Sequence, residues 1–231
     1  MKRFWKTAEA VAEQEGWGVR LDARPLRTPG KALLVVPTEG LAQAIAEEWG
    51  TAGETVDPRA MPLTGLANTA IDHVTPDRLA FAAGLAKYAE ADLACYRAEG
   101  PQTLAERQAT SWDGLLGWAR RRFDVDFAVT TGIIHVDQPP ATVERLAHEV
   151  AARDAFHLAG LSPLVTVGGS LVAALAVLED AMTAAQAWEA VSIDERWQLE
   201  KWGADAEAKA AMDNRRADFF AAARFLELLA I

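Results

Sequence analysis

The spacing of apolar residues changes along this chain, and that change sets the fold class. Before Pro37, apolar residues alternate at 17–21 and form a short run at 31–36, with a turn signal at 28–30 between them. Such alternation is typical of strands, so we predict a small antiparallel sheet there. From Leu63 onward, apolar residues recur at helical intervals. We therefore expect an α+β protein, with a small N-terminal antiparallel β-sheet portion and a helix, followed by a larger, mainly α-helical domain.

This change also suggests where the domains divide. We expect residues 1–62 to form an N-terminal α+β domain and residues 63–231 a mainly helical C-terminal domain. Thr38 is placed to cap the helix of the first domain, and Gly50 or Gly53 to end it. The remaining elements are predicted as helices over 63–74, 76–95, 101–123, 141–159, 163–180, 183–202 and about 204–229, with one strand near 127–136.

The run Leu161–Leu178 contains no charged residue over its eighteen positions, which just reaches the length of a membrane span. Pro163, Thr166 and Ser170 dilute its apolar character, and it stands alone in an acidic chain. A helix that is apolar on every side but does not cross a membrane belongs in a protein core. We therefore predict that 164–178 is the central buried helix of the helical domain.

Charge and cysteine content exclude some classes of protein. The 231 residues include 23 Lys and Arg against 33 Asp and Glu, a formal net charge of −10, which argues against nucleic acid as a partner. Cys95 is the single cysteine, so an intramolecular disulfide is excluded, and we interpret it as a small buried hydrophobe. The first residues, MKRFWKTAEAV, lack the apolar segment of a signal peptide. We expect a cytoplasmic protein with no stable membrane insertion.

No motif for catalysis stands out. The four histidines lack the spacing of a helical metal site, and no glycine-rich loop resembles a nucleotide-binding fingerprint. We therefore expect no catalytic residue, no metal and no cofactor. The residues alone leave two alternatives open. One is an enzyme with a pocket between the two domains, in which Asp72, Asp92 or Glu200 serves as acid or base. The other is a structural subunit of a larger complex.

The stretch 193–205, IDERWQLEKWGAD, combines two tryptophans with charged neighbours near a helix end. Trp197 and Trp202 lie five positions apart, and Gly203 is placed to stop the helix. An amphipathic helix with its tryptophans in the core explains this pattern, and so does a recognition surface. Residue types alone do not separate the two.

A set of short strings runs in order through almost the whole chain and carries a resemblance. They are RFWK (3–6), GW (16–17), LDARPLRTP (21–29), EW (48–49), MPLT (61–64), ANTAID (67–72), DLACYRA (92–98), RQ (107–108), WD (112–113), TGI (131–133), GSL (169–171) and 195–205. With these strings the sequence resembles the assembly chaperones of F-type ATP synthase that bind the α subunit. Trp5 replaces a tyrosine or phenylalanine, and Ala23 a common glycine. Mitochondrial members carry a transit peptide, and the first residues here show none, so this chain resembles the bacterial form.

The resemblance implies holding a partner and not catalysis. It implies that the chain binds unassembled α subunit, shields its exposed interface and releases it to the β subunit. We expect the chain to be a monomer. The family's Glu-x-Trp-Gly string is Glu200–Gly203 here, so Glu200 is the expected partner-binding residue, with Trp202 and Asp205 in the same stretch. We further expect Glu200 at the surface, Trp202 packed beneath it and Trp197 in the core.

Overall fold

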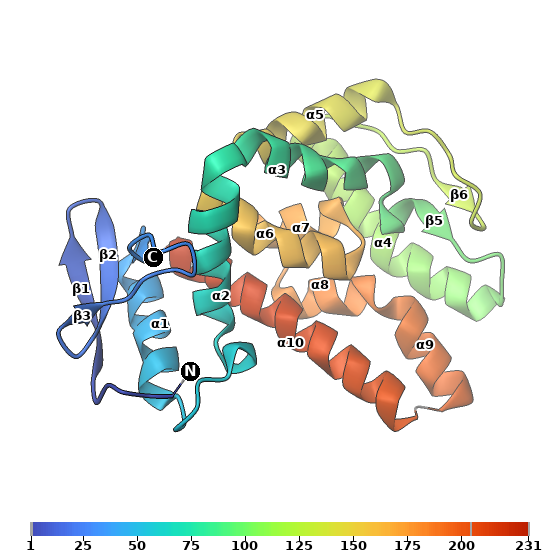
Figure 1. Ribbon diagram of the computed structural model, residues 1–231. Coiled ribbons are helices and arrows are strands. Elements are labelled where there is room, and N and C mark those ends of the chain that lie inside the picture. Colours follow the sequence, from blue (N-terminus) through green and yellow to red (C-terminus); the bar gives the residue numbers. More distant parts are fainter. Residues whose placement is uncertain (1, 204, 231) are drawn as a thin grey trace. The chain divides into compact units, whose positions relative to one another are not determined.

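The computed structural model describes residues 2–203 and 205–230, and it confirms the α+β class: a small antiparallel sheet near the N-terminus precedes a mostly helical chain (Figure 1). Two compact units are present. The first comprises, among the described residues, 2–78, 154–160 and 224–230, and the second comprises 79–153 and 161–223. The division expected between residues 62 and 63 stays a prediction about domains, since compactness alone does not show that a segment folds independently.

The sheet of the first unit is built on one hairpin. Strand β1 (Ala8–Glu13) pairs antiparallel with β2 (Gly16–Leu21), from Ala8 opposite Leu21 to Glu13 opposite Gly16. Strand β2 also pairs with the short strands β3 (Arg24–Pro25) and β4 (Val35–Val36). The predicted antiparallel sheet is confirmed, although only the last two residues of the run 31–36 form a strand.

Helix α1 (Glu39–Thr51) packs on β1 and β2, and its start is as predicted. Thr38 caps it, with its Oγ1 accepting a hydrogen bond from the Leu41 N–H at 3.3 Å. The helix ends at Thr51, with Ala52 as its C-cap, and at neither of the two expected glycines. On the buried side of α1, the Trp5 and Trp49 rings lie 5.1 Å apart, and the Trp5 indole N–H donates to the Trp49 carbonyl at 3.0 Å.

The end of the chain completes the core of the first unit. Phe225 and Leu228, at the end of α10 (Ala206–Leu229), are buried in the same cluster as Leu41. Phe156, near the start of α6 (Ala155–Gly168), stacks on Phe225 with ring centroids 6.5 Å apart. A small sheet with one helix buries little surface alone, so segments distant in sequence supply the missing apolar contacts.

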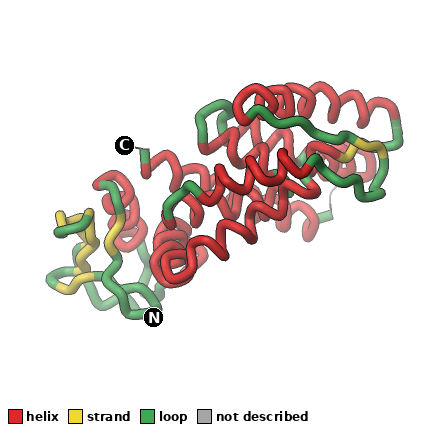
Figure 2. The backbone as a smooth tube through the Cα atoms, turned by 90° about the horizontal axis from the view of Figure 1, so that it is seen from above, coloured by secondary structure: helices red, strands yellow, loops and turns green. Residues whose placement is uncertain are grey.

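After α2 (Pro62–Thr69), a π turn (Ala70–Val74) and a 3₁₀ turn (Thr75–Asp77) lead into the second unit. The helix predicted over 76–95 is broken, because α3 (Arg78–Ala86) gives way to 3₁₀ turns at Lys87–Ala91 and Leu93–Cys95. The other helices are α4 (Gln102–Phe123), α5 (Pro140–Ala151), α7 (Leu171–Leu178), α8 (Ala184–Val191) and α9 (Ile193–Trp202). Figure 2 shows how far helix dominates outside the first sheet.

The prediction of one central helix over 164–178 is wrong. Gly169, with a φ of 69°, ends α6, and Ser170 caps α7 by accepting a hydrogen bond from the Ala173 N–H at 3.0 Å. The glycine allows a backbone conformation that a helix cannot continue through. The burial inferred from the missing charges is confirmed for 171–176, which are at most 1% exposed, whereas Thr166 is exposed. In the described part of the chain, no helix is long and apolar enough to span a bilayer.

The strand expected near 127–136 is much shorter than predicted. Only β6 (Thr130–Thr131) forms, and it pairs in parallel with β5 (Tyr96–Arg97). Gly132 follows with a φ of 87° and turns the chain away, which leaves the rest of the apolar run without a partner strand. An apolar run that lacks a pairing edge has no ladder of hydrogen bonds to extend it.

Candidate partner-binding surface

Helix α9 carries most of the stretch 193–205, IDERWQLEKWGAD. Gly203 ends it with a φ of 79°, and its N–H donates to the Leu199 carbonyl at 2.9 Å. The predicted glycine end is therefore confirmed. Ala204, the expected start of the last helix, lies outside the described residues, and α10 runs from Ala206.

The two tryptophans of α9 have different environments. Trp197 is 8% exposed and belongs to the core, as predicted, whereas Trp202 is 74% exposed. The rings meet edge to face, with centroids 5.6 Å apart. The expectation that Trp202 packs beneath Glu200 is wrong. Five positions along a helix turn the side chain through about 140°, so when Trp197 faces inward Trp202 faces outward.

Glu200 lies at the surface, as predicted, and pairs with a residue of α4. Its Oε2 accepts a hydrogen bond from Arg107 Nη1 at 2.7 Å, and each side chain is about half exposed (50% and 51%). An ion pair this open to water contributes little to stability. Both charged ends therefore stay accessible to a partner.

A groove with a volume of about 710 Å³ lies between α4, α8 and α9, next to this ion pair. Arg107 and Arg196 line it together with Glu106 and Glu189, and Arg196 forms an ion pair with Glu189. Ile193, only 6% exposed, adds apolar lining. The groove therefore offers charges of both signs around a small apolar area, which suits a protein surface of mixed character.

The α4 and α9 sides of this surface are joined below the groove. The Gln108 side chain, which is 1% exposed, donates from Nε2 to Asp194 Oδ1 at 2.6 Å. Partial burial raises the pKa of the Asp194 carboxyl, and the Gln108 hydrogen bond opposes that shift. This contact fixes the position of α9 against α4, so the surface residues above it are held in place.

Asp205 and the first half of α10 complete the exposed region. Asp205 Oδ1 accepts a hydrogen bond from the Ala208 N–H at 2.7 Å, which caps the start of the helix. Over 206–218, only Met212 and Arg215 are even partly buried. Arg215 ties this half of α10 to α9 and α6, donating to Glu195 Oε1 at 2.9 Å and to the Val167 carbonyl at 3.0 Å. Most of the remaining surface of this half is open to a partner.

The residues of this region come from segments that no local sequence pattern links. Arg107 and Glu200 are separated by 93 positions, and the residues around either one do not indicate that the two side chains meet. The structure thus places Arg107 of α4 against Glu200, a pairing that the sequence did not indicate, while Trp202 and Asp205 are exposed further along the chain.

The carboxylates suggested for catalysis are used elsewhere. Asp72 accepts hydrogen bonds from Thr28 Oγ1 at 2.7 Å and from the Gly30 N–H at 2.8 Å, which holds the loop between β3 and β4. Asp92 is fully buried, and burial raises the pKa of its carboxyl. Burial, and after it the negative charge of Asp92, raises the pKa of the Cys95 thiol to about 12. Cys95 is buried, as interpreted, and its thiol stays protonated.

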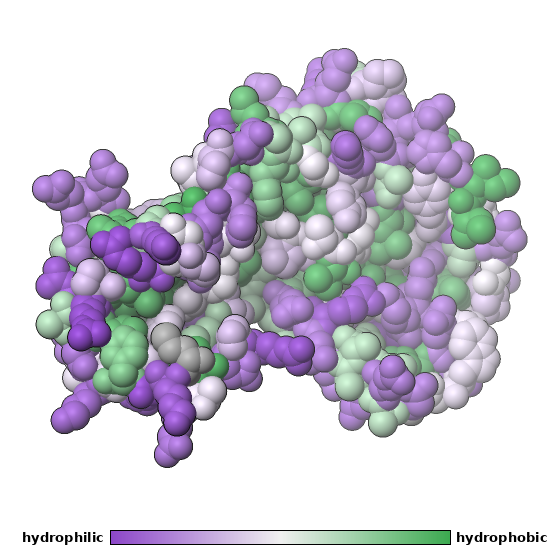
Figure 3. All heavy atoms as spheres, viewed as in Figure 1, coloured by the Kyte–Doolittle hydropathy of each residue, from purple (hydrophilic) through white to green (hydrophobic). Residues whose placement is uncertain are grey.

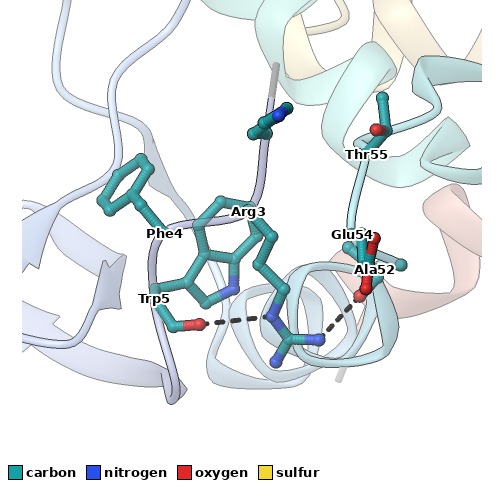
Figure 4. A pocket seen from close by; sticks show the side chains of 8 residues that line it. Arg3, Phe4, Trp5, Ala52, Glu54 and Thr55 are labelled. Carbon is teal, nitrogen blue, oxygen red and sulfur yellow. Dashed lines mark hydrogen bonds between the residues drawn. The ribbon is translucent and has the colours of Figure 1, made fainter.

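A second hollow, of about 550 Å³, lies in the first unit around the N-terminal RFWK string (Figure 4). Arg3 spans it, donating from Nη1 to the Ala52 carbonyl at 2.6 Å and from Nε to the Trp5 carbonyl at 3.2 Å. These bonds tie the N-terminal segment to the end of α1. Arg3 is therefore engaged by the backbone on both sides, and we assign this hollow a structural role.

The histidines and carboxylates of the described residues do not form a metal centre. Within the described ranges, no group of three or more His, Cys, Asp and Glu side chains is arranged to hold a metal ion. His157 contacts Asp154 at 2.8 Å, and that contact is the main cause of the lowered pKa of the Asp154 carboxyl.

Comparison with known proteins gives consistent results. The family model of the ATP12 chaperone protein matches residues 2–120. Protein atp12, mitochondrial, of Schizosaccharomyces pombe is 24% identical over 214 residues, which cover 87% of this chain and 74% of that protein.

Solved structures are similar along the full length. The crystal structure of Atp12 from Paracoccus denitrificans is 45% identical, covers 99% of this chain and 98% of its own, and superposes with a TM-score of 0.93. A protein of Agrobacterium tumefaciens is 36% identical, with 99% and 86% covered and a TM-score of 0.93.

Proposed function

The chain belongs to the ATP12 chaperone family, whose members assist ATP synthase assembly, and from this premise we propose that it binds the unassembled α subunit of F-type ATP synthase. It shields the interface that this subunit exposes before assembly and releases it to the β subunit. It holds its client and catalyses no reaction, and it needs neither a metal nor a cofactor. We propose that it works in the cytoplasm as a monomer.

Physical chemistry explains why such a holder is needed. An unpaired subunit of an alternating ring exposes the apolar surface that it will later bury, and such surfaces associate non-specifically. A chaperone has to cover that surface and yet give way to the true neighbour. Its affinity therefore stays below that of an obligate interface, which favours a surface of aromatic and charged groups.

The observation that carries the proposal is that α9 exposes both Trp202 and, two positions earlier, Glu200 with its open ion pair to Arg107. Tryptophan and arginine are enriched among the residues that dominate binding at interfaces. Because the ion pair is solvent-exposed, exchanging Arg107 for a basic group of the client costs about 1 kcal/mol or less. Glu200 can thus change partners when the client arrives and change back when it leaves.

Titration calorimetry of the purified chain with isolated α subunit tests the proposal. We expect binding to α and none to isolated β, followed by loss of the chaperone–α complex when β is added. A chain that does not bind α, or one that binds both subunits equally well, would contradict the proposed function.

A further inference from the structure

The loop that follows β6 presents two adjacent isoleucines to solvent. Ile133 is 98% exposed and Ile134 is 80% exposed, more than any other large hydrophobic residue in the described ranges. Figure 3 shows a cluster of apolar atoms projecting where Figure 1 places the end of β6. Exposing two such side chains side by side costs solubility, so an apolar tip of this kind calls for a partner.

The loop that carries this tip is held in place by specific bonds. At its base, Gln138 forms two hydrogen bonds with the backbone of Ala128, donating to the carbonyl at 2.9 Å and accepting from the N–H at 3.1 Å. Nearer the tip, the Gly132 N–H donates to the Arg97 carbonyl at 2.8 Å, and His135 Nδ1 lies 3.2 Å from the Tyr96 hydroxyl. The tip is therefore pre-formed, which lowers the entropy lost when it binds.

The surroundings of the tip disfavour a lipid surface and a second copy of the chain. Asp137, with a 99% exposed side chain, and Glu99, whose Oε1 lies 2.6 Å from where a Cβ on Gly132 would stand, place negative charge beside it. Anionic headgroups would be repelled. Two side chains also supply far less than the roughly 800 Å² per partner of a stable protein interface. The tip therefore suits a partner that is held elsewhere on the same body.

A chain of contacts within the second unit links the tip to the α9 surface. Arg97, which pairs with Thr131, donates from Nη1 to the Gln108 carbonyl at 2.8 Å. Gln108 in turn holds Asp194 of α9 at 2.6 Å. Figure 1 shows the β5–β6 pair beside the first half of α4, which also carries Arg107. A client bound at α9 therefore meets a tip that is fixed relative to it.

We infer that Ile133 and Ile134 are an apolar anchor that inserts into an apolar hollow of the α subunit, at a second point beside its contact with α9. This inference rests on the proposed function, because it names a further contact with the same client. The α9 contact supplies exchangeable charge, and the tip supplies apolar burial.

The test compares the double variant Ile133→Ser/Ile134→Ser with the wild type by calorimetric titration against isolated α subunit. We expect the Kd for α to rise at least about tenfold, with the salt dependence of binding unchanged. Leu79→Ser, which removes another exposed apolar side chain of the second unit (62% exposed), should bind like the wild type. Ile133→Leu/Ile134→Leu, which keeps the apolar tip, should also retain binding.

Three results would overturn the inference while leaving the proposed function intact. One is wild-type affinity in the double serine variant, confirmed as folded by its melting temperature. The second is that the wild-type protein binds vesicles of phosphatidylglycerol and phosphatidylcholine and the double serine variant does not. The third is a wild-type dimer, seen by sedimentation, that the variant loses. Failure of the wild type to bind α overturns the proposed function and the inference with it.

Discussion

At the scale of single residues, Glu200 shows how a surface ion pair can serve binding and not stability. The variant Glu200→Lys loses the pair with Arg107, but both side chains are about half exposed, so the melting temperature should change little. If Glu200 faces a basic group of the client, the reversed charge should weaken α binding sharply, because like charges across an interface are costly. Thermal unfolding and calorimetry on the same preparation measure the two effects.

The matched control is Glu195→Lys, which changes a partly exposed carboxylate of α9 that pairs instead with Arg215 of α10. It should bind α better than Glu200→Lys does. A Glu200→Lys protein that is strongly destabilised would assign Glu200 a structural role, and one that is stable and binds normally would remove it from the proposed surface.

At the scale of elements, the buried Asp92 side chain connects the 3₁₀ turn Leu93–Cys95 to the start of α7. It accepts hydrogen bonds from the Ala94 N–H at 3.0 Å, Ser170 Oγ at 2.8 Å and the Val172 N–H at 2.9 Å, so it caps both the turn at Leu93–Cys95 and the start of α7. Asp92→Asn turns one acceptor into a donor that faces other donors. We expect a loss of about 1–3 kcal/mol in the free energy of unfolding, measured with denaturant.

This loss should depend on pH in a defined direction. Burial raises the pKa of the Asp92 carboxyl in the folded state above its ordinary value of 3.8. A group whose folded pKa is raised contributes its full stability below the unfolded pKa, and that contribution falls as pH rises through the folded pKa. The stability difference between wild type and Asp92→Asn should therefore shrink as pH rises from about 4. A difference that grows with pH would show that the hydrogen bonds to the carboxylate outweigh its burial.

At the scale of the whole molecule, the end of the chain is part of the core that its beginning forms. Phe225 is fully buried in the cluster that contains Trp5 and Leu41, and it stacks on Phe156. Phe225→Ala should cost roughly 3–5 kcal/mol in the free energy of unfolding. Hydrogen exchange should report the loss in the amides of β2 and α1. Exposed Leu79→Ala should leave those amides unchanged, and protection in Phe225→Ala equal to the wild type would contradict this account.

The sequence by itself determined the features whose physical cause is local. Thr38 caps α1 with its own side chain, Gly203 ends α9 through a backbone conformation open to glycine, and a run without charge has no face suited to water. Each cause acts within a few residues, so a pattern in the string suffices to predict the helix start, the helix end and the burial.

Only the tertiary structure decided the features that need partners from far along the chain. Asp92 lies 78 positions before Ser170, to which it is hydrogen-bonded. Nothing near the Gly-Gly-Ser string in the sequence indicates this partner, so the pattern there predicts one continuous helix. Arg107 meets Glu200 across 93 positions, and Trp202 faces water because Trp197 faces the core. Pairings of this kind depend on which surfaces meet once the elements pack, and local patterns carry no record of that choice.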